Sequence, residues 1–339
     1  MKTPTMETHL TGITTTGTPH LGNYVGAIRP AIAASRRADV QSYYFLADYH
    51  ALVKNQDPAL IARSSLEIAA TWLALGLDTS RSVFYRQSDI PEIPELAWIL
   101  TTVTAKGLMN RAHAYKAAVQ ANEHEGDADP DKGITMGLFS YPILMAADIL
   151  MFKAHRVPVG KDQKQHVEMA RDIAQRFNYL YGEQFVIPEA DIGEDTAILT
   201  GLDGRKMSKS YNNTIPLFLP SAQLRKMIMK IKTNSLEPGV PKETEGSTLF
   251  DIYRAFATPE ETKAYAAKFA AGAGWGDLKQ ELFGWLDAHL APARGEYERL
   301  MADPKHVESV LKAGAEKARG LATPFMAAIR AAVGIRRLG

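Results

Sequence analysis

The sequence contains no cysteine among its 339 residues. Disulfide bonds, cysteine-ligated zinc sites, iron–sulfur clusters and thiol nucleophiles are therefore excluded. The lack of cysteine also fits a reducing compartment, so we expect a cytoplasmic protein.

Long hydrophobic runs are missing as well. The most apolar stretch, residues 141–152, contains Asp148 and is shorter than the about 20 apolar residues that a membrane-spanning helix requires. Residues 1–10 do not include the apolar segment of a secretory signal. We therefore expect neither a membrane span nor a secretory signal.

The chain has no strong excess of either charge, because 39 basic residues balance 38 acidic ones for a net charge of +1. Any contact with nucleic acid must then come from local basic patches. Two patches are candidates, a predicted helix at 221–232 and the basic tail at 312–339. The basic residues of the first patch are Arg225, Lys226, Lys230 and Lys232. Each patch is equally open to interpretation as an ordinary solvated helix face.

The first 205 residues alternate short β-favouring runs with helical segments. The expected strands are 9–14, 42–47, 82–87 and 156–159, and the expected helices are 22–38, 58–77, 93–105, 137–151 and 162–178. This alternation predicts a Rossmann-like, doubly wound parallel sheet with helices on both faces, an α/β fold. Ligands of such sheets bind beyond the carboxyl ends of the strands.

The remainder of the chain is punctuated by prolines and is predicted to be helical. The expected helices are 221–232, 249–257, 259–271, 278–298 and 307–333. We therefore predict two domains, a Rossmann-type catalytic domain at 1–205 and an all-helical domain at 206–339.

Two local features refine this outline. The segment 121–133 is polar and acidic, which predicts a surface loop. Asp162 and Gln165 have the spacing of a capping box, which predicts that a helix begins at Asp162.

The loop at 17–24, with the sequence GTPHLGNY, joins the first strand to the first helix. Gly17 and Gly22 allow a ligand to approach the backbone, and the helix start offers free N–H groups to a phosphate. His20 and Asn23 are three residues apart, so both can face the same ligand. Taken alone, the loop is more often an ordinary strand–helix turn, and it is neither a Walker loop nor G-x-G-x-x-G.

A second loop at 203–211, DGRKMSKSY, places three cations, Arg205, Lys206 and Lys209, close together after a glycine turn. Lysines in such a loop can close over a triphosphate and stabilise charge as it develops. A solvated basic loop is the alternative, and the loop alone does not decide between them.

Together the two loops resemble the paired signature of the class I aminoacyl-tRNA synthetases, His-x-Gly-His-type early and Lys-Met-Ser-Lys-Ser late. The segments YPILMAADIL at 141–150 and VPVGKDQKQH at 157–166 are similar to the tryptophan-specific branch of that family. The resemblance implies that the chain activates L-tryptophan with ATP and Mg²⁺ and transfers it to tRNA(Trp). It also implies a homodimer, with inserted helices at about 105–155 in the interface and tRNA anticodon binding by the helical domain.

The resemblance further implies roles for individual residues. Catalysis is assigned to His20, Asn23, Lys206, Ser208 and Lys209. ATP binding is assigned to Thr14, Thr16, Gly22, Asn23, Gly160, Asp162, Lys206, Met207, Ser208 and Lys209. Tryptophan binding is assigned to Leu10, Gly12, His50, Tyr141, Met145, Asp148, Val157, Val159 and Gln163. In this set Asp148 accepts the indole N–H, which suits a ligand with a single polar edge, while Tyr141 and Gln163 contact the ammonium group.

The sequence departs from the family pattern at several positions. Asn23 replaces the final histidine of the first motif, Thr14 and Thr15 replace Gln-Pro, and Leu10 replaces an aromatic residue. A tyrosine-specific synthetase, a non-catalytic RNA-binding paralogue and a nucleotidyltransferase that does not use tRNA remain the alternatives. Without the resemblance, the apolar face that carries Tyr141, Met145 and Asp148 is better interpreted as core.

Overall fold

A parallel sheet of five strands lies at the centre of the computed structural model, which describes residues 6–126, 129–192, 199–336 and 338. The strand order is β3-β2-β1-β4-β5, and every adjacent pair is parallel. The strands are β1 (Glu7–Thr14), β2 (Val40–Ala47), β3 (Val83–Arg86), β4 (Arg156–Pro158) and β5 (Glu189–Asp191). The predicted α/β fold and its first four strands are confirmed, and the short β5 is an addition.

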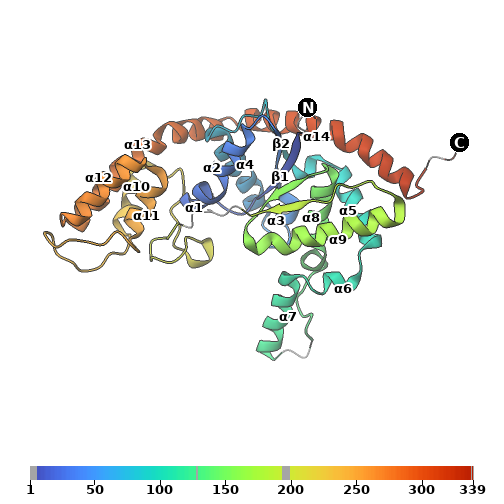
Figure 1. Cartoon of the computed structure of the whole chain (residues 1–339), viewed down its shortest axis with the longest axis horizontal. Coiled ribbons are helices and arrows are strands. Elements are labelled where there is room, and N and C mark those ends of the chain that lie inside the picture. The colour runs from blue at the N-terminus through green and yellow to red at the C-terminus, as the bar shows by residue number, and fades with distance from the viewer. Residues whose placement is uncertain (1–5, 127–128, 193–198, 337, 339) are drawn as a thin grey trace, which may run out of the picture.

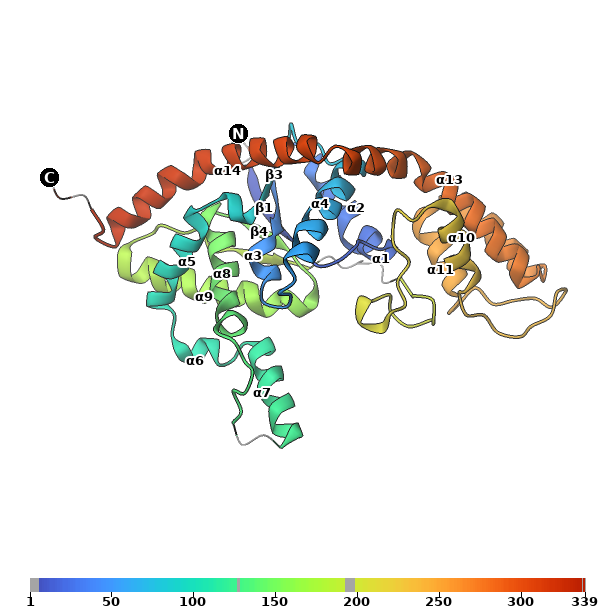
Figure 2. The same ribbon diagram turned by 180° about the vertical axis from the view of Figure 1, so that it is seen from behind.

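Helices cover both faces of the sheet (Figure 1). In chain order the helices of this part of the chain are α1 (Leu21–Asn23), α2 (Arg29–Ser35), α3 (Asp48–Ala51), α4 (Pro58–Ala74), α5 (Glu92–Val103), α6 (Lys106–Met109), α7 (His113–Glu125), α8 (Met136–Met151) and α9 (Lys164–Tyr181). Of these, α6 and α7 project away from the sheet (Figures 1 and 2). Successive strand residues point to opposite faces. Tyr43 and Phe45 of β2 accordingly join the core with α5, α8 and α9, whereas Tyr44 and Leu46 join a second core with α2 and α4.

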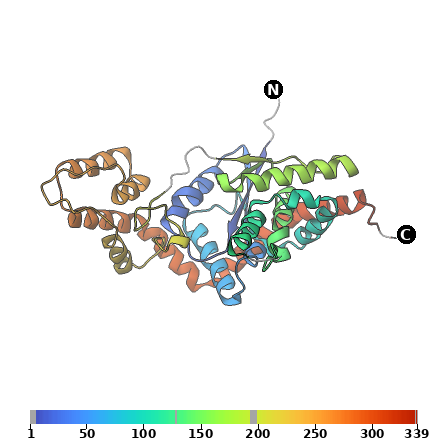
Figure 3. The ribbon, with the colours of Figure 1, turned by 90° about the horizontal axis from the view of Figure 1, so that it is seen from below.

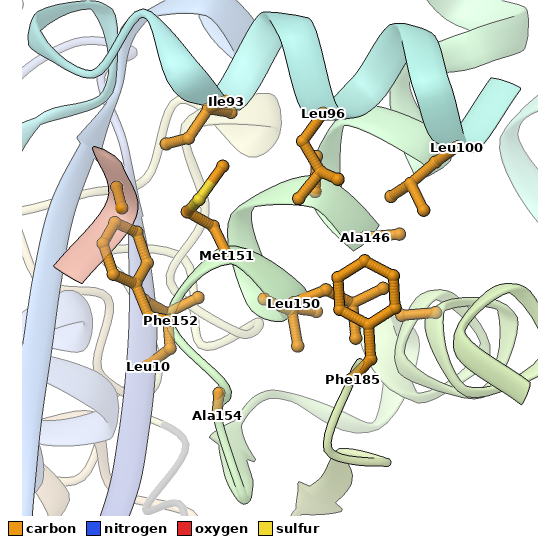
Figure 4. Close-up of a cluster of buried hydrophobic side chains, with 14 of the residues drawn as sticks. Leu10, Ile93, Leu96, Leu100, Ala146, Leu150, Met151, Phe152, Ala154 and Phe185 are labelled. Atoms are coloured by element: carbon orange, nitrogen blue, oxygen red, sulfur yellow. The ribbon is translucent and has the colours of Figure 1, made fainter. Parts of the chain in front are cut away.

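The larger core lies between α5 and α8 (Figure 4). Ile93, Leu96 and Leu100 recur at helical spacing along α5, and all three are fully buried against α8. Burial of one such side chain stabilises the fold by roughly 1.5–3 kcal/mol, so this contact fixes where α8 lies relative to the sheet.

The C-terminal part of the chain is helical, as predicted. Its helices are α10 (Ser221–Met229), α11 (Thr248–Phe256), α12 (Pro259–Ala270), α13 (Trp275–Ala302) and α14 (Pro304–Ala332). Helices α10–α12 and the first part of α13 gather at one end of the molecule (Figure 3) around a separate core that includes Tyr265 and Phe269.

Helix α14 does not join that group but runs across the sheet (Figures 1 and 2). Leu311 packs in the core that contains Phe84, whereas Ala318 packs in the core that contains Tyr85. A Cβ atom at Gly314 would lie 1.7 Å from the carbonyl oxygen of Phe84, so the helix backbone rests directly on β3. The last helix thus passes from one face to the other over edge strand β3, unlike the single helical unit expected for 206–339.

Three local expectations need correction. The predicted loop at 121–133 is helical up to Glu125, because α7 continues until Gly126 adopts a left-handed conformation with φ of 77°; residues 127–128 lie outside the described residues. Helix α9 begins at Lys164 after a 3₁₀ turn, and Asp162 does not cap it. The helix expected at 22–38 is broken by a π-helical turn at Tyr24–Ile28.

None of the helices in the described part of the chain combines the length and apolar character that a membrane span requires.

Candidate active site

The two motif loops, almost 190 positions apart in the sequence, contact each other. The backbone N–H of Gly22 donates to the Met207 sulfur at 3.4 Å, and the Lys209 ammonium donates to the carbonyl of Thr16. The chain that follows the second loop also pairs with the first, since Leu21 N–H donates to the Ile215 carbonyl at 3.0 Å. The two predicted loops therefore form one surface beside the carboxyl end of β1.

His20 and Asn23 in the first loop cap each other. His20 Nδ1 accepts from the backbone N–H of Asn23 at 3.3 Å, and Asn23 Oδ1 accepts from the N–H of His20 at 3.1 Å. Burial, assisted by the charge of Lys209, lowers the pKa of His20 to about 4. His20 is therefore neutral at pH 7 and helps to set the shape of the loop.

The carboxyl end of β1 stays open to solvent although β1 is the middle strand. Gly12 and Thr14 are exposed, whereas Thr15 between the strand and the loop is fully buried and donates to the Ala47 carbonyl. Gly12 lies against the ring of Phe45, where an added Cβ atom would come within 2.9 Å. Small residues here leave room above the strand for a ligand.

Asn213 shapes the second loop from inside. Its side-chain oxygen accepts from Ser208 N–H at 2.8 Å, and its amide donates to Asp203 Oδ1 at 2.7 Å and to the Lys206 carbonyl at 3.1 Å. Hydrogen bonds from Asn213 and Arg205 lower the pKa of Asp203 to about 2. Met207 is buried while Lys206 and Lys209 keep exposed surface, so the loop is fixed at its base. The ammonium group of Lys209 is directed toward the Thr16 carbonyl of the first loop.

A buried carboxylate lies on the other side of the site. Asp148 on α8 is fully buried, His50 Nε2 lies 2.8 Å from its Oδ2, and the Gln87 amide donates to both carboxylate oxygens at 2.8 and 3.0 Å. Burial raises the pKa of Asp148, and the bonds from His50 and Gln87 oppose that rise. Gln87 is itself held because its oxygen accepts from the N–H of Tyr49 at 3.1 Å.

A second polar chain runs from α8 to the start of α9. Tyr141 Oη lies 2.6 Å from His166 Nε2, and His166 Nδ1 lies 2.9 Å from Gln163 Oε1. Burial lowers the pKa of His166, so the ring is neutral and can accept from Tyr141 while it donates to Gln163. The Tyr141 and His50 rings meet edge to face at 6.3 Å, which joins this chain to the Asp148 network.

Apolar residues on β1, on α8 and on or just after β4 complete this side. Leu10 of β1 and Val157 of β4 are buried in the core that carries α8, and Met145 and Val159 pack against it half-buried. The order of the sheet brings these residues together because β4 is the neighbour of β1. Gly160 and Asp162 follow β4 and are exposed.

The two basic patches behave differently. In α10 the residues Arg225 and Lys226 are exposed while Leu224 and Ile228 are buried, as the helical pattern predicts, and Lys230 directly after the helix is also exposed. Lys232, just beyond α10, is exposed as well.

In the second patch, the basic tail at 312–339, several cations are engaged in contacts within the molecule. Arg319 and Arg330 form ion pairs with Glu92 and Glu95 of α5, and Lys317 donates to the Thr79 carbonyl. These cations attach α14 to α5 and to the turn that precedes β3.

Gln87, His166 and Asn213 are the site residues that sequence reasoning missed. Gln87 and His166 each bond to a residue far away in the sequence, Asp148 and Tyr141, whereas Asn213 bonds to residues of its own loop. Hydrophobic periodicity carries no signal for any of these contacts. Gln87 directly follows the apolar run of β3, so its place at the carboxyl end of a strand was the one available clue.

Comparison with known proteins gives consistent matches along the chain. A family model for tRNA synthetases class I (W and Y) matches residues 5–291. The chain is 65% identical over 332 residues to the tryptophan–tRNA ligase of Pseudomonas aeruginosa, which covers 97% of this chain and 74% of that protein. It is 61% identical over 331 residues to the tryptophan–tRNA ligase of Xanthomonas axonopodis pv. citri, covering 97% and 76%.

A solved structure shows the same similarity in three dimensions. Tryptophanyl-tRNA synthetase from Campylobacter jejuni, complexed with ADP and tryptophan, superposes with a TM-score of 0.89 at 41% identity. The match covers 96% of this chain and 99% of that one.

Proposed function

The chain belongs to the class I tRNA synthetases of the tryptophan and tyrosine branch, and from this premise we propose how its residues do the work of a tryptophan–tRNA ligase. The enzyme joins L-tryptophan to ATP, giving tryptophanyl-adenylate and pyrophosphate, and then transfers tryptophan to the 3′-terminal ribose of tRNA(Trp). The observation that carries the residue-level proposal is the contact between the two loops, through Gly22 and Met207 and through Thr16 and Lys209.

Tryptophan binds on the side of the buried carboxylate. The contacts we assign to it are Leu10, Gly12, His50, Tyr141, Met145, Asp148, Val157, Val159 and Gln163. The indole N–H donates to Asp148, which Gln87 and His50 hold in orientation. Because Asp148 has no exposed surface, binding displaces a covering side chain, and Met145, one turn away, is the adaptable one.

Tyr141 and Gln163 bind the ammonium group of tryptophan. Neutral His166 between them accepts from the Tyr141 hydroxyl and donates to Gln163 Oε1, which fixes the direction of both groups. The carboxylate of tryptophan is then directed toward the open end of β1 and the nucleotide.

ATP binds across the two loops. The contacts we assign to it are Thr14, Thr16, Gly22, Asn23, Gly160, Asp162, Lys206, Met207, Ser208 and Lys209. A tryptophan carboxylate oxygen attacks the α-phosphorus, the new acyl–phosphate bond forms, and the bond to pyrophosphate breaks. The substrate supplies the nucleophile, so catalysis consists of positioning and charge stabilisation.

The cations of the second loop act on the leaving group. Lys209 leaves the Thr16 carbonyl for the phosphates, and Lys206 and Ser208 close with it to stabilise the charge on departing pyrophosphate. His20 and Asn23 hold the phosphate end of ATP through the loop that they cap.

Magnesium enters as part of the MgATP substrate. Among the described residues no group of three or more histidine and acidic side chains gathers to hold a metal ion. We therefore assign Mg²⁺ to the phosphate oxygens and water, which suits the coordination preference of this ion.

The tRNA and the partner subunit are assigned to separate surfaces. The exposed cations Arg225, Lys226, Lys230 and Lys232 fit the phosphate backbone of tRNA, and α10–α13 provide the anticodon-binding region. We assign the homodimer interface to the helices near 105–155, supported by the exposed Met136 (72%) and, on adjacent α5, Trp98 (70%). A cytoplasmic location is supported by the absence of cysteine.

One assay tests the proposed function. Amino-acid-dependent exchange between pyrophosphate and ATP is measured with each of the twenty amino acids, and we expect exchange with tryptophan and none with tyrosine. Charging of tRNA(Trp) by the same preparation checks the second step. Exchange with tyrosine, or with no amino acid, would overturn the assignment.

A further inference from the structure

Helix α4 holds the turn at 16–18 from beneath. The backbone N–H of Gly17 donates to Ser64 Oγ at 3.0 Å, and the Thr18 hydroxyl donates to Glu67 Oε2 at 2.8 Å. Ser64 and Glu67 are three residues apart and therefore share one face of the helix. Two consecutive residues of the turn are thus bonded to the same element.

The acceptors on α4 are buried, although one of them is a carboxylate. Ser64 is 1% exposed and Glu67 is 5% exposed. Burial of a carboxylate is costly unless partners compensate. The second oxygen of Glu67 accepts from Arg63 Nε at 2.6 Å, and the Arg63 side chain faces solvent. Packing alone does not require a carboxylate at position 67. The hydrogen bond between Glu67 and the Thr18 hydroxyl therefore needs an explanation.

The same turn receives Lys209 from its other side. The Lys209 ammonium donates to the Thr16 carbonyl, and it lies so close to Gly17 that an added Cβ atom would come within 3.2 Å. Gly17 has a φ of 68°, which favours glycine. Burial lowers the pKa of Lys209, and the charge of Glu67 opposes that lowering. The turn therefore lies between the acid of α4 and the lysine of the second loop.

We propose that Ser64 and Glu67 are positioning residues for adenylate formation, which hold the Thr16–Gly17–Thr18 turn in the geometry that receives ATP and Lys209. The proposal rests on the proposed function. Neither residue touches the substrate, because each acts through a bond to the turn. The residues assigned to tryptophan lie on β1, α3 and α8 and on β4 and the turns that follow it. None of these residues is hydrogen-bonded to Ser64, Glu67 or the turn at 16–18, so this support affects the nucleotide and leaves tryptophan binding unchanged.

The test is a double-mutant cycle on the bond between Thr18 and Glu67. Thr18→Val, Glu67→Ala and the double variant are compared in tryptophan-dependent pyrophosphate exchange with ATP varied. We expect each single variant to raise the KM for ATP roughly tenfold, the effect of losing a hydrogen bond to a charged acceptor. The double variant is expected to be no worse than the poorer single variant, because both remove the same bond.

Two further variants separate positioning from general support of the fold. Glu67→Gln keeps an acceptor for the Thr18 hydroxyl and is expected to restore the KM for ATP to within about threefold of the wild type. Ser64→Ala is expected to raise that KM severalfold. Its matched control is Ser65→Ala, which loses only a bond to the Ile61 carbonyl within α4 and is expected to change nothing.

Equilibrium dialysis with tryptophan alone completes the experiment. The dissociation constant of tryptophan is expected to stay within about twofold of the wild-type value in every variant. Additive losses in the cycle, an unchanged KM in Thr18→Val, or a parallel loss of tryptophan affinity would overturn the inference. If Glu67→Ala does not fold, Thr18→Val and Glu67→Gln still decide the matter. A wild type without tryptophan-dependent exchange would instead refute the proposed function.

Discussion

The side of the site that we assign to tryptophan and the side that we assign to the nucleotide differ in how their polar groups are held. On the tryptophan side Asp148, Gln87 and His166 are at most 4% exposed and are bonded to one another or to neighbouring helices. On the nucleotide side Lys206 and Lys209 are exposed, on a loop fixed from within by Asn213.

This difference follows from what each side must do. Selecting one amino acid requires acceptors whose direction is set before the ligand arrives, because a wrong ligand is rejected by leaving them unpaired. Stabilising pyrophosphate requires cations that follow charge as it develops, so they gain from freedom to move. Buried, hydrogen-bonded acceptors and exposed cations thus belong to two different parts of one site.

Removing Lys209, a cation of the second loop, should produce the largest effect. Lys209→Ala is expected to lower kcat for tryptophan-dependent pyrophosphate exchange by about 10²–10³, the usual effect of losing one charge-stabilising donor. Tryptophan affinity, measured by equilibrium dialysis, is expected to stay within about twofold because no tryptophan-side group contacts Lys209. Lys263→Ala on exposed α12 is the control. Equal losses of rate and affinity would remove the distinction between the two sides.

Removing Asp148, the buried acceptor on the side assigned to tryptophan, should have the next largest effect. Asp148→Ala removes the acceptor of the indole N–H and also the acceptor of the Gln87 NH₂ group, so we expect kcat/KM for tryptophan to fall about thirty- to a hundredfold. The benzothiophene analogue of tryptophan lacks the indole N–H and therefore tests the same contact by changing the ligand. Its kcat/KM should be low with the wild type and should fall little further with Asp148→Ala.

The control for this prediction is Asp172→Asn, an exposed acid on α9. If the analogue and tryptophan were used equally well by the wild type, Asp148 would not be the acceptor of the indole N–H.

The smallest predicted effect concerns His20, the buried histidine of the first loop. Its pKa is about 4 in the folded chain, below its ordinary value near 6.5, so the unfolded chain binds more protons between these values. Stability should therefore fall as the pH drops from 6.5 toward 4, with a contribution of about 1 kcal/mol at pH 5.5. Urea unfolding of the wild type and His20→Gln at pH 7.5 and 5.5 measures it, with His306→Gln as the exposed control. An equal pH dependence in all three proteins would contradict it.

The fold was predictable where burial imposes a pattern. Strand β2 is apolar because both of its faces are covered, and α8 is apolar for most of its length. Each element is therefore recognisable in the sequence as an apolar segment. Helix α7 was missed at its acidic end because it has no buried residue to give the pattern.

The candidate site was predictable only where a motif or helical spacing carried it. Tyr141, Met145 and Asp148 were placed on one helix because their spacing is a local property, whereas the two loops were placed together because of the resemblance to the class I synthetases. His166 and Gln87 gain their partners from the fold, 25 and 61 positions away, and no local pattern records such a bond. The path of α14 was missed for the same reason, because its contact with Phe84 depends on one glycine.

The contact of Gly314 with β3 also bears on how the chain is made. An uncovered edge strand can pair with strands of other molecules. During synthesis β3 emerges more than two hundred residues before α14. The growing polypeptide therefore exposes the β3 edge of the sheet until α14 has left the ribosome. A chain interrupted before residue 304 would keep that edge open and would be prone to aggregation, however complete its catalytic loops.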